Sequence, residues 1–220
     1  MNKLYGIGMG PGDPELLTLK AVKAIEASEV IVAPTSEEGG VSIAYETAKE
    51  YINKDTKVII AHFPMGKKDT KSKVQEIYET IKRELEEGKT VSFLTIGDPL
   101  VYSTYVHLLK YIQNNGFTVE TIPGITSFCA AASLTDRPVV MGNEALLVIP
   151  AGKVNEIRDE KYVVVMKVYK KEREVIETLE EKGFEYVMVR RAGREGEAII
   201  YDKEEIFKEC EYMSLILASR

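Results

Sequence analysis

The stretch from Val91 to Thr104 constrains the fold most, because it joins a buried strand to a helix through a rigid turn. Its first six residues, VSFLTI, form the near-continuous apolar run expected of a strand covered on both faces. The turn Gly97-Asp98-Pro99 follows, and a helical pattern then runs over residues 102–115. Open α/β sheets bind ligands at the carboxyl ends of such strands, so the turn predicts a crevice. An ordinary turn in which Asp98 only caps the helix is the simpler alternative.

The same alternation of strand and helix opens the chain. Residues 3–8 fit a strand, Asp13 and Pro14 fit the start of a helix over residues 15–27, and residues 30–33 fit a second strand. This β-α-β pattern predicts parallel strands in an α/β fold. Further strands are expected at 57–61, 118–122, 145–149, 162–166, 186–189, 198–202 and 213–217, and further helices at 43–52, 74–87, 128–134, 172–182 and 204–210.

Glycines at positions 6, 8, 10 and 12 suggest a nucleotide-binding loop, but their spacing excludes the two common ones. A Gly-x-Gly-x-x-Gly fingerprint would need glycine where the chain has Pro11, Asp13 or Glu15. No Gly-x-x-x-x-Gly-Lys-Ser/Thr sequence occurs either. The loop is therefore either the edge of a different kind of crevice or a tight turn without a ligand.

Composition excludes several classes of function. A net charge of −6 and a pI near 5.2 argue against a general nucleic-acid binder. Without a signal peptide or an apolar run of about 18 residues, we expect neither secretion nor a membrane span. Cys129 and Cys210 suggest no disulfide framework, which favours a cytoplasmic protein. His62 and His107 lack neighbours at ligand spacing, so we expect no metal site.

A second turn from strand to helix, Pro123-Gly124-Ile125-Thr126-Ser127, precedes a helix rich in alanine. Three motifs thus follow in order: GMGPGD at residues 8–13, GDP at 97–99 and PGITS at 123–127. With these motifs the chain resembles the tetrapyrrole methylases, which transfer methyl groups from S-adenosylmethionine in cobalamin and sirohaem synthesis. Within that family, PGDPELLTLKA, GDPLVYSTY and PGITSFCAAA are most similar to C20-methyltransferases of precorrin-2 or cobalt-factor II.

The resemblance implies two α/β domains, taken as residues 1–120 and 121–220, with the active site in the cleft between them. It also implies a homodimer, a tetrapyrrole substrate, and S-adenosylmethionine as the methyl donor, released as S-adenosylhomocysteine. Carried over by position, the cofactor contacts are Pro11, Ile96, Gly97, Asp98, Val101, Tyr102, Thr126, Ser127, Met166 and Ala192. Several relatives have a catalytic Asp after the second strand, where this chain has Pro34, so we name no general base.

The substrate expected from the resemblance carries many carboxylates, and the net charge of the protein is −6, so any attraction must be local. By resemblance, Gly10, Gly12 and Asp13 border the substrate. Arginine binds carboxylates in a bidentate manner, and Arg137 and Arg191, with the neighbours Arg190 and Arg194, are the candidates. The alternative is that these arginines pair with surface glutamates.

Three functions stay open at this point. The first is methylation of C20 of precorrin-2 or cobalt-factor II. The second is methylation at another tetrapyrrole carbon, or of a protein, as in diphthine synthase. The third is a regulator that binds a nucleotide or a tetrapyrrole without catalysis.

Overall fold

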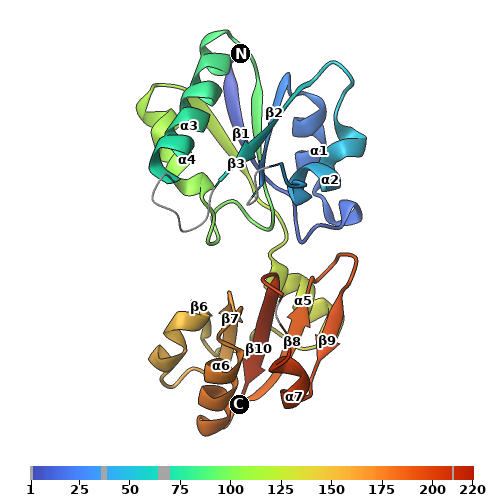
Figure 1. The fold of residues 1–220 in the computed structure, drawn as a ribbon, viewed down its shortest axis with the longest axis vertical. Helices are drawn as coiled ribbons and strands as arrows, with labels where there is room; N and C mark the ends of the chain where they lie inside the picture. Colours follow the sequence, from blue (N-terminus) through green and yellow to red (C-terminus); the bar gives the residue numbers. More distant parts are fainter. Residues whose placement is uncertain (1, 36–38, 64–69, 210) are drawn as a thin grey trace. The chain divides into compact units, whose positions relative to one another are not determined.

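The computed structural model describes residues 2–35, 39–63, 70–209 and 211–220, and the chain divides into two compact units (Figure 1). The first unit comprises residues 1–126 and the second residues 127–220, and each contains a five-stranded sheet. The expected boundary after residue 120 falls within the strand Thr118–Ile122. Because that strand pairs with the first strand of the chain, the first unit continues to Thr126.

The sheet of the first unit is parallel. Its strands are β1 (Lys3–Gly8), β2 (Val30–Thr35), β3 (Lys57–His62), β4 (Val91–Thr95) and β5 (Thr118–Ile122). They lie in the order β3-β2-β4-β1-β5, and each of these neighbouring pairs is parallel. β1 and β2 therefore run in the same direction, as the opening β-α-β pattern predicts, with β4 between them. Every residue of β4 is buried, which confirms the interpretation of VSFLT as a strand covered on both faces.

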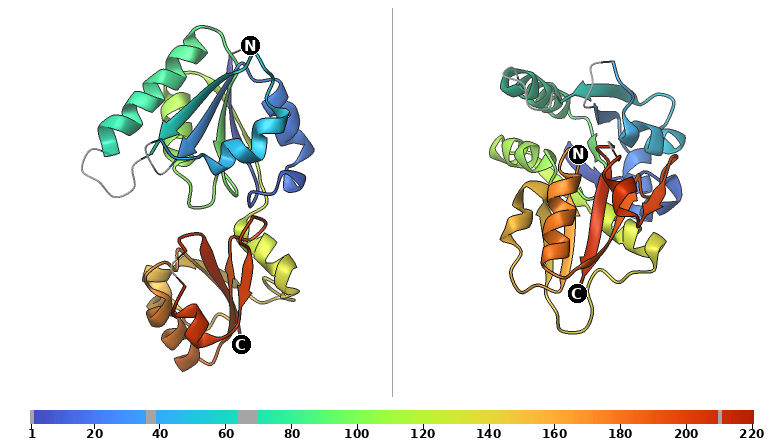
Figure 2. Two further views of the ribbon diagram at one scale, coloured as in Figure 1. Left: turned by 45° about the vertical axis from the view of Figure 1, so that its right-hand side comes forward. Right: turned by 60° about the horizontal axis from the view of Figure 1, so that its bottom comes forward.

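Helices cover both faces of this sheet, as Figures 1 and 2 show. On one face lie α1 (Leu19–Glu26), α2 (Ile43–Ala48) and the short η2 (Lys49–Tyr51), and their apolar side chains pack on Ile7, Ile31 and Leu94. On the other face lie α3 (Thr70–Glu86) and α4 (Tyr105–Asn114), which pack on Leu4, Val32 and Phe93. The result is a three-layer unit whose strands all end at one edge.

Two helices differ from the sequence pattern, one because a local cap divides it and the other because its start is delayed. The expected helix over residues 15–27 consists of η1 (Pro14–Leu16) and α1, separated by the extended Leu17 and Thr18. The Thr18 hydroxyl accepts a hydrogen bond from the backbone N of Ala21 and so starts α1 afresh. The helix expected from residue 102 begins at Tyr105, since Tyr102 has a positive φ of 49°.

The second unit has a mixed sheet in the order β6-β7-β10-β8-β9. Its strands are β6 (Leu146–Pro150), β7 (Tyr162–Met166), β8 (Glu185–Arg190), β9 (Ala198–Ile200) and β10 (Ser214–Ser219). β6 and β7 are parallel, while β10 is antiparallel to β7 and β8, and β8 to β9. The helices are α5 (Ser127–Thr135), η3 (Ala151–Glu156), α6 (Glu172–Glu181) and α7 (Lys203–Ile206). The expected helix 204–210 therefore ends at Ile206, and Cys210 lies outside the described residues.

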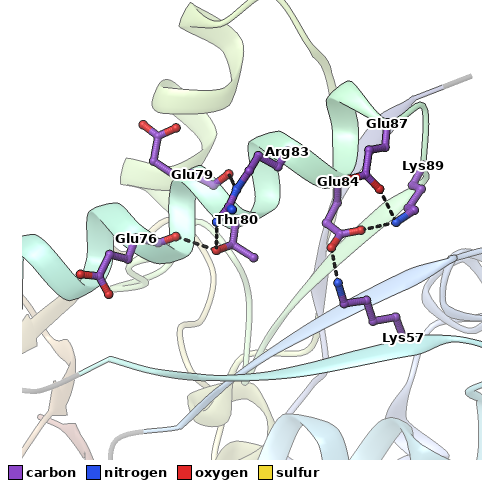
Figure 3. Close-up of polar contacts among 8 residues, drawn as sticks. All are labelled: Lys57, Glu76, Glu79, Thr80, Arg83, Glu84, Glu87 and Lys89. Atoms are coloured by element: carbon purple, nitrogen blue, oxygen red, sulfur yellow. Dashed lines mark hydrogen bonds and ion pairs between the residues drawn. The ribbon is translucent and has the colours of Figure 1, made fainter.

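A buried carboxylate joins three segments at the amino ends of β3 and β4. Figure 3 shows Lys57, at the start of β3, and Lys89, just before β4, both reaching Glu84 of α3. The Glu84 side chain is only 8% exposed, and Lys89 Nζ lies 2.6 Å from its Oε2. This ion-pair cluster fixes α3 to the edge of the sheet opposite the carboxyl ends of the strands.

Within the described part of the chain, no helix is both long and apolar enough to cross a membrane. The same residues contain no group of three or more His, Cys, Asp or Glu side chains that could hold a metal ion. His62 ends β3 and His107 lies in α4, and neither takes part in such a group.

Candidate active site

Two of the sequence motifs meet at the carboxyl edge of the first sheet. Beyond the ends of β1 and β4, the backbone N of Met9 donates to the carbonyl of Thr95 at 2.8 Å. Gly10 and Gly97 then form an isolated antiparallel bridge, in which Gly97 N donates to Gly10 O at 2.7 Å and Gly10 N to Gly97 O at 3.3 Å. The glycine-rich loop and the Gly-Asp-Pro turn are therefore hydrogen-bonded to each other.

Asp98 ties the third motif to this pair. Its Oδ1 accepts a hydrogen bond from the backbone N of Leu100 at 2.9 Å, which closes its own turn. Its Oδ2 accepts one from the backbone N of Gly124 at 3.1 Å, in the turn that follows β5. Asp98 is not the cap of α4, which begins at Tyr105 after Thr104; one of its carboxylate oxygens closes the turn that precedes the helix, and the other links two loops that are distant in the sequence.

The loops approach so closely that only glycine fits where they touch. A Cβ added to Gly8 would lie 2.3 Å from the backbone N of Gly124. A Cβ added to Gly124 would lie 2.3 Å from the carbonyl oxygen of Gly97. Real Cβ atoms do not approach backbone atoms this closely, so any side chain at either position must separate the loops.

Gly6 has a different partner. A Cβ at this position would lie 2.0 Å from Cζ of Tyr105, the first residue of α4, whose ring packs against β1. The Tyr105 hydroxyl lies 2.9 Å from Oγ1 of Thr121, the residue that pairs with Gly6 on β5. Burial raises the pKa of Tyr105, so its hydroxyl stays protonated. At positions 6 and 8, the glycine run therefore serves packing within the protein.

The Gly-Asp-Pro turn is open on its other side. Gly97 has a φ of +75°, and a Cβ built on it would meet no atom within 4 Å. Next to it, Leu100 and Tyr102 are large apolar residues that are 56% and 47% exposed. The Thr95 hydroxyl oxygen is buried without a hydrogen-bond partner in the described structure. Open space, apolar surface and an unsatisfied hydroxyl fit a ligand with an apolar body and polar groups.

The other expected cofactor residues fall into two sets, one in each unit. In the first unit, Pro11 is buried, and Ile96, Val101 and Thr126 are half-buried. In the second unit, Ser127 begins α5, Met166 ends β7 and the buried Ala192 follows β8. Met166 and Ala192 belong to one sheet edge, because β10 begins there and pairs Leu215 with Met166 and Ser214 with Arg190.

The expected substrate residues of the first loop are engaged within the protein. Gly10 is paired with Gly97, and the carbonyl of Gly12 accepts a hydrogen bond from Oγ1 of Thr47 at 3.3 Å. Asp13 caps η1 by accepting from the backbone N of Glu15 at 2.8 Å. These contacts fix the shape of the loop, and its contact with a substrate stays a prediction.

The two arginines expected to bind substrate carboxylates lie at opposite ends of β8. Arg137 Nη2 lies 3.9 Å from a carboxylate oxygen of Glu185, the first residue of the strand. Arg191 directly follows Arg190, the last residue of β8. It donates to one carboxylate oxygen of Glu211 from Nε at 3.0 Å and from Nη2 at 2.6 Å. Because a strand rises about 3.3 Å per residue, Glu185 and Arg191 are about 20 Å apart. The structure does not bring Arg137 and Arg191 together.

Sequence reasoning missed Thr95. Its signal was a hydroxyl at the carboxyl end of a strand that is otherwise almost entirely apolar, directly before the Gly-Asp-Pro turn. A buried hydroxyl at that place has to find a partner, and the structure provides none among the described residues.

Comparison with known sequences gives consistent matches over nearly the whole chain. The family model described as tetrapyrrole (corrin/porphyrin) methylases matches residues 3–206. A probable cobalt-precorrin-2 C(20)-methyltransferase of Methanocaldococcus jannaschii is 34% identical over all of this chain and 97% of its own. A precorrin-2 C(20)-methyltransferase of a Sinorhizobium species is 32% identical over 99% of this chain and 95% of its own.

Solved structures have the same fold. A cobalt precorrin-4 methyltransferase superposes with a TM-score of 0.79 at 20% identity, covering 99% of this chain and 94% of its own. A uroporphyrin-III C-methyltransferase of Thermus thermophilus, solved with S-adenosyl homocysteine, gives 0.76 at 20% identity, covering 99% of this chain and 97% of its own. At this identity, the likeness establishes the two-sheet α/β fold.

Proposed function

Because the chain belongs to the tetrapyrrole methylase family, we propose that it is an S-adenosylmethionine-dependent methyltransferase that methylates C20 of a precorrin-2-type tetrapyrrole. The observation that carries this proposal is the similarity over nearly the full length of two relatives that are named for that reaction. A relative named cobalt-precorrin-4 C(11)-methyltransferase is 33% identical, but over only 60% of this chain. The extent of the match therefore favours C20 over C11.

We further propose that the cofactor binds at the open side of the Gly-Asp-Pro turn. The space at Gly97 admits a ligand close to the backbone, and the buried Thr95 hydroxyl is left to bond with one. Asp98 has both carboxylate oxygens engaged by backbone N–H groups, so we assign it to holding the loops. S-adenosylmethionine supplies an electrophilic sulfonium methyl group when bound. Ile96, Val101 and Tyr102 supply apolar surface beside it.

The task of the protein in this reaction is alignment. A meso carbon of a reduced tetrapyrrole is already electron-rich, so the reaction needs no strong base, and we propose none. Holding two reactants in a productive geometry can contribute about 7–11 kcal/mol when the alignment is ideal. The hydrogen bonds between the glycine-rich loop, the Gly-Asp-Pro turn and Gly124 provide rigidity for that purpose.

The finer expectations from the resemblance remain proposals. We propose that the active site lies in a cleft between the two domains, that the enzyme is a cytoplasmic homodimer, and that Thr126, Ser127, Met166 and Ala192 complete the cofactor site. Sedimentation equilibrium tests the dimer, for which we expect twice the chain mass of 24.6 kDa. A monomer at micromolar concentration would contradict it.

Methyl transfer tests the function directly. The protein is incubated with methyl-labelled S-adenosylmethionine and either precorrin-2 or its cobalt complex, without oxygen. We expect one labelled methyl group in the product by mass spectrometry, located at C20 by NMR. A label at another carbon would make the protein a different methylase of the family, and cofactor binding without transfer to either substrate would oppose the proposal. Comparing the two substrates also shows whether cobalt must already be present.

A further inference from the structure

Three arginines gather around the turn that follows β8, and two of them already have carboxylate partners. Arg190 Nη1 donates to Glu209 at 2.9 Å, and its Nε donates to the carbonyl of Gly196 at 3.1 Å. Arg191 donates twice to Glu211. Both of these guanidinium groups are therefore held within the protein.

Arg194 differs from its neighbours. It is half-buried, its Nε is fully buried with no hydrogen-bond partner, and it forms no ion pair within the described residues. Its backbone is fixed, because its N donates to the carbonyl of Arg191 at 3.0 Å and its carbonyl accepts from the N of Glu197. The Glu197 carboxylate is engaged by the backbone N of Gly193 at 2.7 Å. A donor in this position requires an acceptor from outside the turn.

Within the part of the chain that the structure describes, the charges around Arg194 also leave a cation without a carboxylate of its own. Burial lowers the pKa of Arg194, and the positive charge of Arg191 lowers it further, while Glu211 is the neighbouring carboxylate that opposes this. Glu211 already accepts both hydrogen bonds of Arg191. Two guanidinium groups therefore share one carboxylate, and a second anion would complete the group.

The backbone of the turn is strained in a way that favours a functional role. Arg191 has a φ of +48°, in the left-handed region that a side chain disfavours by about 1–2 kcal/mol. Its N donates to the carbonyl of Met213 at 2.9 Å, which helps to hold this conformation. Strain of this kind concentrates at ligand-binding turns.

We propose that Arg194, rather than Arg191, binds a carboxylate of a ligand at the turn that follows Ala192. The inference rests on the proposed function, because S-adenosylmethionine and a precorrin-2-type tetrapyrrole both carry carboxylates. Arg191 and Glu211 act as positioning residues that orient the turn. The fork of Arg194 makes charge-assisted hydrogen bonds to the carboxylate, which satisfy its buried Nε.

The direct test observes the Nε–H group of Arg194 by NMR. In protein labelled with ¹⁵N at arginine Nε, the Arg194 signal is the one that disappears in the Arg194→Lys variant. S-adenosylhomocysteine and precorrin-2 are titrated separately into the wild type. A shift of this signal with either probe supports the proposal and identifies which ligand brings the carboxylate. A signal that is unmoved by saturating amounts of both probes overturns it.

Variants give an independent measurement. Calorimetry with S-adenosylhomocysteine and an absorbance titration with precorrin-2 are compared for wild type and Arg194→Gln. We expect a loss of affinity of about tenfold or more for one of the two probes, as for a lost hydrogen bond to a charged group. Arg194→Lys should retain part of that affinity. If Arg194→Gln does not fold, the NMR titration of the wild type decides.

Arg173→Gln is the matched control, because it removes the same charge from an exposed position on α6 of the same unit. It should leave both affinities unchanged, and equal losses in both variants would overturn the proposal. All of these measurements record binding. If ligands bind through Arg194 but no methyl group is transferred, only the proposed methyltransferase function is contradicted. If the protein transfers methyl groups but its Arg194 signal is unperturbed by both ligands, only the role of Arg194 is contradicted.

Discussion

Asp98 accepts a hydrogen bond from the backbone N of Gly124 at 3.1 Å, and this contact joins the turn after β4 to the turn after β5. Its other carboxylate oxygen accepts from the N of Leu100 at 2.9 Å. Since both oxygens have partners in the protein, Asp98 would influence a ligand through the loops that it holds.

The first prediction concerns this link. Asp98→Ala removes an acceptor from two backbone N–H groups, so we expect a loss of stability of about 1–3 kcal/mol and weaker binding of S-adenosylhomocysteine. Thermal unfolding and calorimetry measure the two effects. Asp13→Ala is the control, because Asp13 accepts a hydrogen bond within its own turn in the same manner and, among the described residues, its carboxylate bonds to no second loop. Unchanged affinity in a folded Asp98→Ala protein would refute the assignment of the cofactor to this turn.

The second prediction separates backbone strain from ligand space. Gly97 and Gly88 both have positive φ, +75° and +85°, and a Cβ on either meets nothing within 4 Å. Alanine at each should therefore cost about 1–2 kcal/mol of stability. Only Gly97→Ala should reduce the affinity for S-adenosylhomocysteine, because its methyl group occupies the proposed cofactor space. If Gly97→Ala and Gly88→Ala bind S-adenosylhomocysteine equally well, the open side of the turn is not the cofactor site.

The third prediction concerns the contact between Gly8 and Gly124. A Cβ on Gly8 would lie 2.3 Å from a backbone nitrogen that cannot move aside like a side chain. We expect Gly8→Ala to lose at least about 1–3 kcal/mol of stability and most of its methyl transfer. Gly152→Ala serves as the control, because the nearest atom to its Cβ is 4.0 Å away. Denaturant unfolding of the two variants provides the comparison, and equal stabilities would show that the loops can separate at little cost.

The sequence predicted the framework well where apolar runs are bounded by turn residues. The strands Lys3–Gly8, Thr118–Ile122 and Tyr162–Met166 have the predicted bounds. The break between η1 and α1 was not predicted, because the apolar period continues through Leu17 while Thr18 starts a new cap. The short η3 at Ala151–Glu156 was also missed, since a helix of this length has too little periodicity to recognise.

Motif order located the candidate site, but the sequence could not supply the contacts that build it. Asp98 is hydrogen-bonded to Gly124, and Gly8 also lies against Gly124. Both contacts depend on the order of β4, β1 and β5 in the sheet. The arginines show the same limit. The sequence does not show how far apart Arg137 and Arg191 lie; the contact of Arg137 with Glu185 and the course of β8 place them at opposite ends of that strand.

The last prediction uses the buried Glu84 at the opposite edge of the first sheet. Hydrogen bonds from Lys57 and then Lys89 hold the pKa of Glu84 below its ordinary value (Figure 3). In the unfolded chain the pKa of a glutamate is about 4.3. Between the folded and the unfolded pKa of Glu84, the unfolded state therefore binds more protons than the folded state. The contribution of Glu84 to stability is therefore complete above about pH 5 and is lost as the pH falls through the folded pKa.

Glu84→Gln should accordingly lower the free energy of unfolding at pH 7 by about 1–2 kcal/mol, a value reduced by the solvent exposure of both lysines. The difference from wild type should shrink as the pH falls below about 4, where the wild-type carboxylate is progressively protonated. Urea unfolding at a series of pH values measures it. Glu86→Gln, on the same helix but 52% exposed, should differ from wild type by less than about 0.5 kcal/mol at pH 7. A difference for Glu84→Gln that stays constant down to pH 3 would mean that the side chain stabilises α3 by packing and not by its charge.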